Sequence, residues 1–231
     1  MNPALSPTEL PRHFGRQIYS FLHTLKIPPS ILKTCVLSGI PMFDYLEKID
    51  QQLLLLGNSF HTTFLDKIIP CLTLPWVWIP LFLWWLIEIY KIYKLKIALV
   101  LVFIIALLFA ADQSSVLIKD SVKRYRPTYN LQLQDKVHVV DNYRGGQYGY
   151  VSSHATNSFA IAFFLFFLLE ASSTKWLRIS FFLWAVIMCY TRIYLGVHYP
   201  FDLFSGALLG TLLAFILHKI FVKLQQPNNT T

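Results

Sequence analysis

Charged residues are scarce in this chain of 231 residues: they make up 14% of it, whereas hydrophobic residues make up 55%. Soluble domains usually hold about a quarter charged residues, so the composition excludes an ordinary soluble domain. No internal repeat or low-complexity run is apparent. Cysteine is also rare, and Cys35, Cys71 and Cys189 have neither a motif spacing nor histidines at metal-ligand distance in the sequence. We therefore expect buried thiols and no zinc site.

Long apolar stretches take the place of the missing charge, and each is close to the ~20 residues that a helix needs to cross a bilayer. The five stretches are Cys71–Tyr90, Ile97–Ile118, Ala155–Ala171, Leu177–Leu195 and Leu203–Val222. Before them, Phe43–Leu56 gathers its leucines and isoleucine near one helical face, which is typical of a helix lying in the membrane interface. The sequence thus predicts an all-α integral membrane bundle of about five transmembrane helices with an N-terminal interfacial helix.

Lysine and arginine are placed unevenly in the links between these stretches. Three links on one side contain Lys91, Lys94, Lys96, Lys175, Arg178 and Lys223. Because cytoplasmic loops are rich in such residues, we expect these links to face the cytoplasm. The opposite face then contains the long loop Lys119–Ser153 and the turn Arg192–Asp202. That long loop is itself basic, and binding an anion explains its charge better than binding nucleic acid does.

Residues 1–41 contain no clean apolar core, so they do not read as a secretory signal peptide. We interpret them as a leader of uncertain structure, and residues 42–231 as one membrane domain. If the N-terminus lies on the outer face, the basic residues of the leader have to cross the membrane. Met42 as the natural start would remove that difficulty.

Three short polar motifs fall on the predicted outer face, each beside the end of a membrane stretch. They are Lys119–Pro127, Ser152–His154 and Arg192–Asp202. A phosphoryl-transfer site needs cations and N–H donors around the transferred group, with a nucleophile and an acid in line. The motifs offer the three cations Lys119, Arg126 and Arg192, and a guanidinium group can bind two phosphate oxygens at once.

The other polar residues of the motifs fit the remaining roles. Ser152 or Ser153 would cap the helix that His154 enters, and the free N–H groups of its first turn favour an anion. His198 and Asp202 are four residues apart, so the carboxylate can hold one imidazole nitrogen while the other attacks phosphorus. His154 would protonate the leaving oxygen. No metal or other cofactor is required by this scheme.

Together the motifs resemble those of the type 2 phosphatidate phosphatase superfamily, which includes membrane lipid phosphatases and the vanadium haloperoxidases. The family pattern is Lys-x6-Arg-Pro, then Pro-Ser-Gly-His, then Ser-Arg-x5-His-x3-Asp. The first motif matches in full, and Thr191 replaces the serine of the third. In the second, Val151 replaces the proline and Ser153 replaces the glycine. The resemblance covers about Asp50 to Val222 and is closest to short bacterial members.

The resemblance implies that His198 is the nucleophile, Asp202 its partner and His154 the general acid. It implies phosphate binding by Lys119, Arg126, Ser152 and Arg192. Ser153 can still supply the backbone N–H of the family glycine if its φ is negative. Asp112 lies on the helical face of Lys119 and is either functional or a structural partner of the basic residues. Arg144 could reach a headgroup or remain a solvated charge.

We therefore expect a metal-independent lipid phosphatase in a bacterial inner membrane, with its site on the periplasmic face and its substrate's tail in the bilayer. Candidate substrates are undecaprenyl diphosphate, lipid A, phosphatidylglycerophosphate and phosphatidate, and the basic outer loop favours the first two. One alternative is vanadium-dependent halide oxidation at the same residues. Another is a non-catalytic transport or scaffold protein, which would be expected to lack at least one catalytic residue.

Overall fold

The computed structural model describes residues 42–169 and 175–225, and the predicted leader 1–41 lies outside them. The described residues are helical throughout their regular structure, apart from an isolated bridge between Tyr125 and Tyr148, so the predicted all-α class is confirmed. The α-helices are α3 (Met42–Asn58), α4 (Thr63–Leu72), α5 (Ile79–Tyr93), α6 (Ile97–Val122), α7 (Ser153–Leu168), α8 (Lys175–Tyr194) and α9 (Pro200–Gln225). Short 3-10 helices are η1 (Pro75–Trp78), η2 (Lys94–Lys96) and η3 (Pro127–Tyr129).

The chain divides into two units between Leu53 and Leu54, inside α3. The first unit contains the beginning of α3, where a helix was predicted; that this helix lies in the membrane interface stays a prediction. The second unit contains the remaining helices and all three sequence motifs.

Three stretches of the described residues are long and apolar enough to cross a membrane: Pro75–Val122, Lys175–Tyr194 and Pro200–Gln225. The first includes both α5 and α6, which are joined by η2, and α7 is apolar but shorter. The protein is therefore an integral membrane protein. The predicted first stretch began too early, because Cys71 belongs to α4 and the chain leaves that helix at Thr73 before η1 begins. The break is hidden in the sequence because the residues on both sides of it are apolar.

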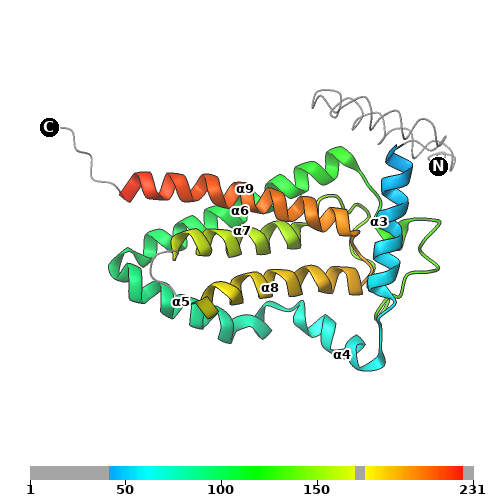
Figure 1. Ribbon diagram of the computed structural model, residues 1–231, viewed down its shortest axis with the longest axis horizontal. Coiled ribbons are helices and arrows are strands. Elements are labelled where there is room, and N and C mark those ends of the chain that lie inside the picture. The colour runs from blue at the N-terminus through cyan, green and yellow to red at the C-terminus, as the bar shows by residue number, and fades with distance from the viewer. Residues whose placement is uncertain (1–41, 170–174, 226–231) are drawn as a thin grey trace. The chain divides into compact units, whose positions relative to one another are not determined.

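Helix α7 packs against α6, α8 and α9 in the second unit (Figure 1). Two glycines of α9, spaced by four, allow an especially close approach to α7. A Cβ atom at Gly206 would lie 2.7 Å from the carbonyl oxygen of Ser152, and one at Gly210 would collide with the carbonyl oxygen of Thr156. Small residues at this spacing let membrane helices pack backbone against backbone. The contact brings the start of α7 beside the start of α9, where the amide of Ser152 donates to the carbonyl of Asp202 at 3.1 Å.

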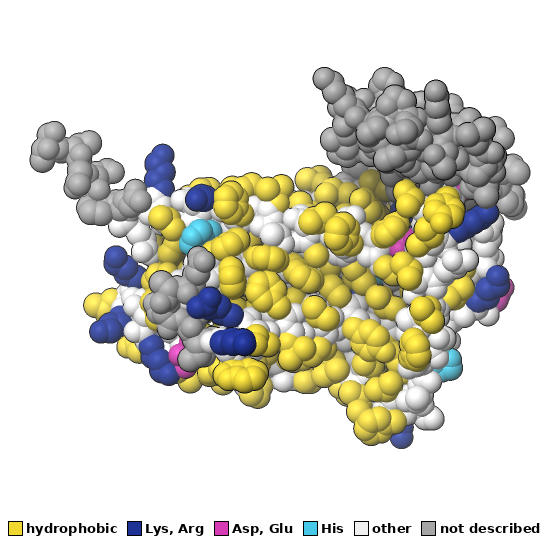
Figure 2. Space-filling model, in the orientation of Figure 1, with side chains coloured by type: hydrophobic (Ala, Val, Ile, Leu, Met, Phe, Trp, Pro, Cys, Tyr) yellow, Lys and Arg dark blue, Asp and Glu magenta, His cyan; other side chains and the backbone are white. Residues whose placement is uncertain are grey.

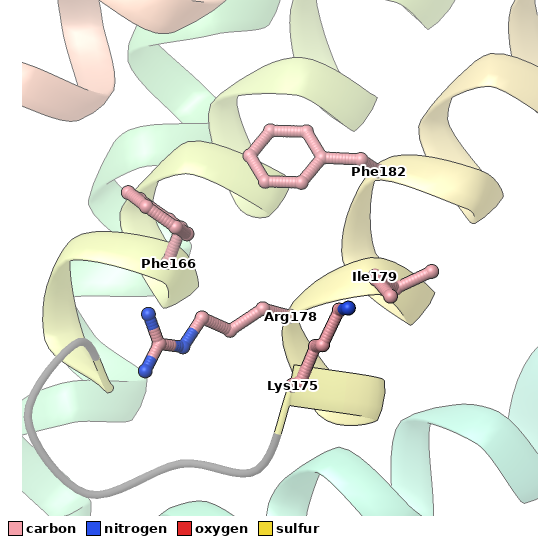
Figure 3. Close-up of a pocket in the computed structure, with 5 residues that line it drawn as sticks. All are labelled: Phe166, Lys175, Arg178, Ile179 and Phe182. Carbon is pink, nitrogen blue, oxygen red and sulfur yellow. The ribbon is translucent and has the colours of Figure 1, made fainter.

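Large apolar side chains cover much of the surface over α5, α6, α8 and α9, as lipid contact requires (Figure 2). Basic side chains gather at the end where α9 finishes and the α5–α6 turn lies (Figures 1 and 2). A shallow pocket at this end, between α7 and α8, is lined by Phe166, Lys175, Arg178, Ile179 and Phe182 (Figure 3). Phe166 is about 20 Å along α7 from its first residue, so this pocket is separate from the three motifs.

The long connection between α6 and α7 is joined to neighbouring segments by polar contacts that are buried or partly buried. The side chain of Asn58 accepts from the amide of His138 at 2.7 Å and donates to the carbonyl of Tyr194 at 2.7 Å. Asp66 accepts from the hydroxyl of Tyr194 at 2.6 Å and lies 2.8 Å from the ring of His138. These hydrogen bonds, that from Tyr194 first, lower the pKa of Asp66. The connection is thereby held near the end of α8.

Candidate active site

The three motifs meet at one end of the second unit, where α6 finishes, α7 begins, α8 finishes and α9 begins (Figure 1). The ammonium group of Lys119 donates to the hydroxyl of Ser153, which ties α6 to α7. His154 is under the electrostatic influence of Lys119, Arg126, Arg192 and His198 together. The structure thus brings the predicted residues of all three motifs into one cluster.

His198 lies in the short link between α8 and α9, and both sides of that link are fixed by local structure. Gly196 has φ +66°, a left-handed conformation that ends α8 at little steric cost, and a Cβ atom there would collide with Val137. Pro200 then begins α9 at the position where a missing N–H costs nothing. His198 is held in place between these two turns and is only 1% exposed.

The carboxylate of Asp202 faces the Nδ1 side of His198. The distance between Nδ1 and Oδ2 is 3.5 Å, which is the outer limit of a hydrogen bond, and Oδ2 also accepts from the amide of Tyr199 at 3.0 Å. With Nδ1 turned toward a carboxylate, Nε2 is the ring nitrogen left for another partner. The predicted pairing of His198 with Asp202 is therefore present as a loose contact.

Burial lowers the pKa of His198 to about 4, even though Asp202 acts in the opposite direction; the nearby Arg126 and Lys119 lower it further. The imidazole is consequently neutral at physiological pH. A neutral imidazole has a free lone pair, which a nucleophile requires.

Arg192 is buried in the last turn of α8, and the adjacent Thr191 holds one edge of its guanidinium group. Its Nε donates to Thr191 Oγ1 at 3.0 Å, and that hydroxyl donates to the carbonyl of Met188 at 2.7 Å. Threonine thus gives the hydroxyl expected of the family serine. Tyr143 exerts a favourable electrostatic influence on Arg192, while Nη2 is buried without a partner among the described residues.

Ser152 is the N-cap residue of α7, with φ −74° and ψ 115°, but its side chain makes no capping hydrogen bond. Its Oγ is buried without a hydrogen-bond partner in the part of the chain that the structure describes. Unsatisfied buried polar atoms are costly, and here Ser152 Oγ and Arg192 Nη2 come from two different elements of one cluster. Unpartnered buried donors of this kind, like the N-terminus of a helix, suit the binding of an anion.

Ser153, which replaces the family glycine, does not adopt a positive φ and begins α7 as an ordinary helical residue. Its hydroxyl contacts Lys119 and lies 2.6 Å from the hydroxyl of Ser115. The side chain of Ser153 therefore contacts α6, and Ser153 keeps the backbone N–H that the family glycine would provide. His154, the next residue, is exposed, as suits a group that has to reach a leaving-group oxygen.

Arg126 is positioned by a short antiparallel pairing between two parts of the long connection. Its amide donates to the carbonyl of Gln147 at 3.0 Å, and its Nε donates to the carbonyl of Tyr148 at 3.1 Å. Gly145, with φ +67°, makes room for the guanidinium, because a Cβ atom there would lie 2.5 Å from Nη1. The pairing places Gly149 against His198 and Asp202.

Two residues of this pairing were not singled out as site residues from the sequence. A Cβ atom at Gly149 would lie 3.1 Å from Asp202 Oδ2 and 3.5 Å from His198 Nδ1. Arg124 donates to Asp202 Oδ1 at 2.6 Å. Arg124 and Arg126 are two residues apart, as residues on one face of an extended segment are, but the sequence around them does not predict a strand.

The two residues left open by the sequence differ in their surroundings. Asp112 is half-buried in α6 and exerts a favourable electrostatic influence on Lys119, which supports its role as a partner of the basic residues. Arg144 is exposed, and its carbonyl accepts from the hydroxyl of Thr128 at 2.9 Å. Its backbone thus shapes the connection while its side chain faces outward.

Residues 96–226 match the family model of the PAP2 superfamily. This range is more than half of the chain and includes all three motifs, so the chain belongs to the PAP2 superfamily, as its resemblance implied. Together with its membrane helices, this membership makes the protein a membrane lipid phosphatase, a hydrolase that acts on phosphoric esters.

The chain is also similar to individual lipid phosphatases and to a solved structure. The chain is 39% identical to the lipid A 4′-phosphatase of Bacteroides thetaiotaomicron over 191 residues, which cover 80% of this chain and 84% of that protein. It is 26% identical to the lipid A 4′-phosphatase of Porphyromonas gingivalis over 186 residues, covering 78% of this chain and 75% of that protein. Among solved structures, the crystal structure of Aquifex aeolicus LpxE superposes with a TM-score of 0.55 at 25% identity, covering 73% of this chain and 93% of that one.

Proposed function

We propose that this phosphatase removes the 4′-phosphate of lipid A through a phosphohistidine intermediate on His198. The substrate is supported by the 39% identity to a lipid A 4′-phosphatase over most of both chains. The site is supported by one observation above all: Ser152 Oγ and Arg192 Nη2 are buried without partners among the described residues, in a cluster that also contains Lys119 and Arg126. A phosphate group satisfies such donors and neutralises such cations.

In the first step, Nε2 of His198 attacks phosphorus while the phosphate oxygens are held by the cations and by the N-terminus of α7. The bond between phosphorus and the sugar oxygen breaks, and His154 donates a proton to that oxygen. Asp202 stabilises the positive charge that develops on the imidazole ring. The positive charge needed to hold the phosphoryl group comes from side chains, so the proposal requires no metal ion.

In the second step, water attacks the phosphorus of the phosphohistidine. His154, which lost its proton in the first step, now accepts one from that water molecule. The bond between phosphorus and Nε2 breaks, inorganic phosphate forms, and His198 returns to its neutral state. Each histidine is thus restored after one turnover, and the donors of Ser152 and Arg192 bind the phosphoryl group throughout.

We also propose that α5 to α9 are five transmembrane helices and that the site faces the periplasm of a bacterial inner membrane. The basic links before α6, before α8 and after α9 support this orientation, because cytoplasmic ends of spans are rich in lysine and arginine. The substrate then keeps its acyl chains in the outer leaflet while its phosphate reaches the start of α7. The identity to lipid A 4′-phosphatases favours this hydrolase over halide oxidation or a scaffold role.

Phosphate release from purified protein tests both parts of the proposal. Lipid A, undecaprenyl diphosphate, phosphatidylglycerophosphate and phosphatidate are each offered to wild type and to His198→Ala. We expect release mainly from lipid A by the wild type and none by the variant. Release only from another of the four lipids would overturn the substrate, whereas an active His198→Ala protein would overturn the mechanism. A lipid A sample already lacking its 4′-phosphate is the matched control for the position attacked.

A further inference from the structure

Arg124 makes a short polar contact to the proposed catalytic pair, although it stands outside every residue position that the family motifs specify. Its Nη1 lies 2.6 Å from Asp202 Oδ1, across 78 residues of sequence. The Asp202 side chain is fully buried, and that of Arg124 is 12% exposed. A charged pair this deeply placed is costly to remove from water, so its geometry has to be well determined to persist.

Both ends of Arg124 are held in place. Its carbonyl accepts from the amide of Gly149 at 2.9 Å, within the pairing that also positions Arg126. Its guanidinium stacks over the ring of Tyr199, with Cζ 4.0 Å from the ring centroid, a favourable cation–π geometry. The hydroxyl of Tyr199 in turn accepts from the side chain of Asn130 at 3.1 Å. Arg124 is therefore a rigid support rather than a mobile surface cation.

The two oxygens of Asp202 are divided between different partners. Oδ1 accepts from Arg124, while Oδ2 accepts from the amide of Tyr199 and faces His198 Nδ1 at 3.5 Å. Because both oxygens are engaged, a rotation of the carboxylate plane would break at least one of these hydrogen bonds. Lys119 and Arg126 add a favourable electrostatic influence on the same carboxylate. Arg124 is the one of these cations for which the described residues show a direct bond to Asp202.

We infer that Arg124 is a positioning residue: it fixes the carboxylate of Asp202 so that Oδ2 stays directed at His198, and it shares the negative charge of Asp202 with that histidine. It acts through Asp202 and does not bind the phosphate. The inference rests on the proposed roles of His198 and Asp202. It predicts an effect on the chemical step rather than on substrate binding, which distinguishes Arg124 from Arg126 and Arg192.

The test compares Arg124→Gln and Arg124→Lys, using the lipid that releases most phosphate in the wild-type assay. Arg144→Gln removes an exposed arginine from the same connection and is the matched control. We expect Arg124→Gln to lower kcat on the order of 10- to 100-fold, as for lost partners that orient a reacting group, with KM and inhibition by inorganic phosphate within about twofold of wild type. Arg124→Lys, which keeps the charge, should recover most of kcat, and Arg144→Gln should match the wild type.

The pH profile gives a second readout that a merely structural role would not change. Without the guanidinium, the charge of Asp202 is less compensated and acts more strongly on His198, so protonation of His198 becomes easier. The acid limb of kcat should therefore move to higher pH in Arg124→Gln and stay in place in Arg124→Lys. If Arg124→Gln does not fold, Arg124→Met replaces it, because methionine keeps apolar contact with Tyr199.

Three results would overturn the inference. The first is a wild-type kcat in Arg124→Gln, and the second is a raised KM with unchanged kcat, which would make Arg124 a phosphate ligand. The third is a loss of kcat in Arg124→Lys as large as the loss in Arg124→Gln. His198→Ala is assayed alongside: if it is active, the proposed mechanism fails, whereas an inactive His198→Ala beside a normal Arg124→Gln rejects the role of Arg124 alone.

Discussion

The hydroxyl of Ser153 accepts a hydrogen bond from the ammonium group of Lys119 at the position where the family has glycine. The same hydroxyl lies 2.6 Å from that of Ser115, so a single side chain connects α7 to two residues of α6. The departure from the family pattern thus adds a contact to Lys119, the proposed phosphate-binding cation, without removing the backbone N–H.

Removing this support should weaken substrate binding. A hydrogen bond to a charged group contributes about 1.5–3 kcal/mol, part of which the freed ammonium regains from water. We therefore expect Ser153→Ala to raise KM about fivefold, equivalent to about 1 kcal/mol, with a smaller change in kcat. Ser121→Ala is the control, because Ser121 is exposed in the last turn of α6 and its hydroxyl bonds only to the carbonyl of Leu117 in the hydrogen bonds described. Equal KM values for both variants would contradict the role of Ser153.

The depressed pKa of His198 predicts activity well into the acid range. Since its pKa is about 4, the imidazole keeps its lone pair until the pH approaches that value, instead of losing it near the ordinary 6.5. After correction for ionisation of the substrate phosphate, kcat/KM should fall on the acid side through about pH 4. An acid limb centred near 6.5 would show that His198 titrates as an exposed histidine.

The same shift makes folding depend on pH in a defined direction. Between about pH 6.5 and 4 the unfolded chain binds a proton at His198 that the folded protein does not bind. The contribution of this residue therefore destabilises the fold as the pH falls through that window and levels off below it. Thermal unfolding in detergent should show a smaller loss of Tm on acidification in His198→Gln than in the wild type. A parallel loss in the two proteins would contradict this linkage.

Two glycines of the long connection form a matched pair for testing how tightly the catalytic pair is packed. A methyl group at Gly149 would press on Asp202 and Arg126, each 3.1 Å away, whereas one at Gly146 meets nothing within 4 Å. Displacements of an ångström at reacting groups can cost about 100-fold in rate. We expect Gly149→Ala to lower kcat by that order and Gly146→Ala to leave it unchanged. Similar kcat values in the two variants would show that the site tolerates the extra methyl group.

Ser152 should show a trade between activity and stability. Its buried hydroxyl lacks a partner among the described residues, and such a group costs about 1–3 kcal/mol. Ser152→Ala should therefore keep or raise Tm while lowering kcat/KM on the order of 100-fold, through loss of a donor to the phosphoryl group. Ser158→Ala should instead lower Tm and leave kcat/KM unchanged, since that buried hydroxyl donates to the carbonyl of His154 at 2.7 Å. A fall in Tm without a fall in activity in Ser152→Ala would refute the assignment.

Metal removal and phosphate analogues test the source of the positive charge. Because the proposed site holds the phosphoryl group with lysine and arginine, incubation with EDTA should leave phosphate release unchanged. Vanadate can adopt the five-coordinate geometry of the transition state, and it should inhibit more strongly than inorganic phosphate does. Inhibition by EDTA that added metal restores would refute the metal-independent mechanism.

The sequence predicted the helices and the three motifs because both depend on local patterns. A stretch of apolar residues implies a membrane helix by itself, and the spacing of His198 and Asp202 is set within one turn of chain. The motifs were expected to meet because each stands at the same predicted end of a membrane stretch. The structure adds that Ser152 of the second motif bonds to Asp202 of the third.

Contacts made through the long connection were beyond such reasoning. The bond of Arg124 to Asp202 depends on the pairing of Tyr125 with Tyr148, and nothing in the surrounding sequence repeats with the period of a strand. The close approach of Gly149 to His198 depends on the same pairing. The early start predicted for the first span has a different cause, since apolar residues continue through the turn at Thr73.

The seam between α7 and α9 has a consequence for how a lipid reaches the site. At Gly206 and Gly210 the two backbones meet with no side chain between them, so no change of rotamer can loosen the contact. Ser152 and Asp202, at one end of this seam, are also joined by the hydrogen bond from the amide of Ser152 to the carbonyl of Asp202. An opening that admits a lipid headgroup would therefore have to come from segments other than this contact between α7 and α9.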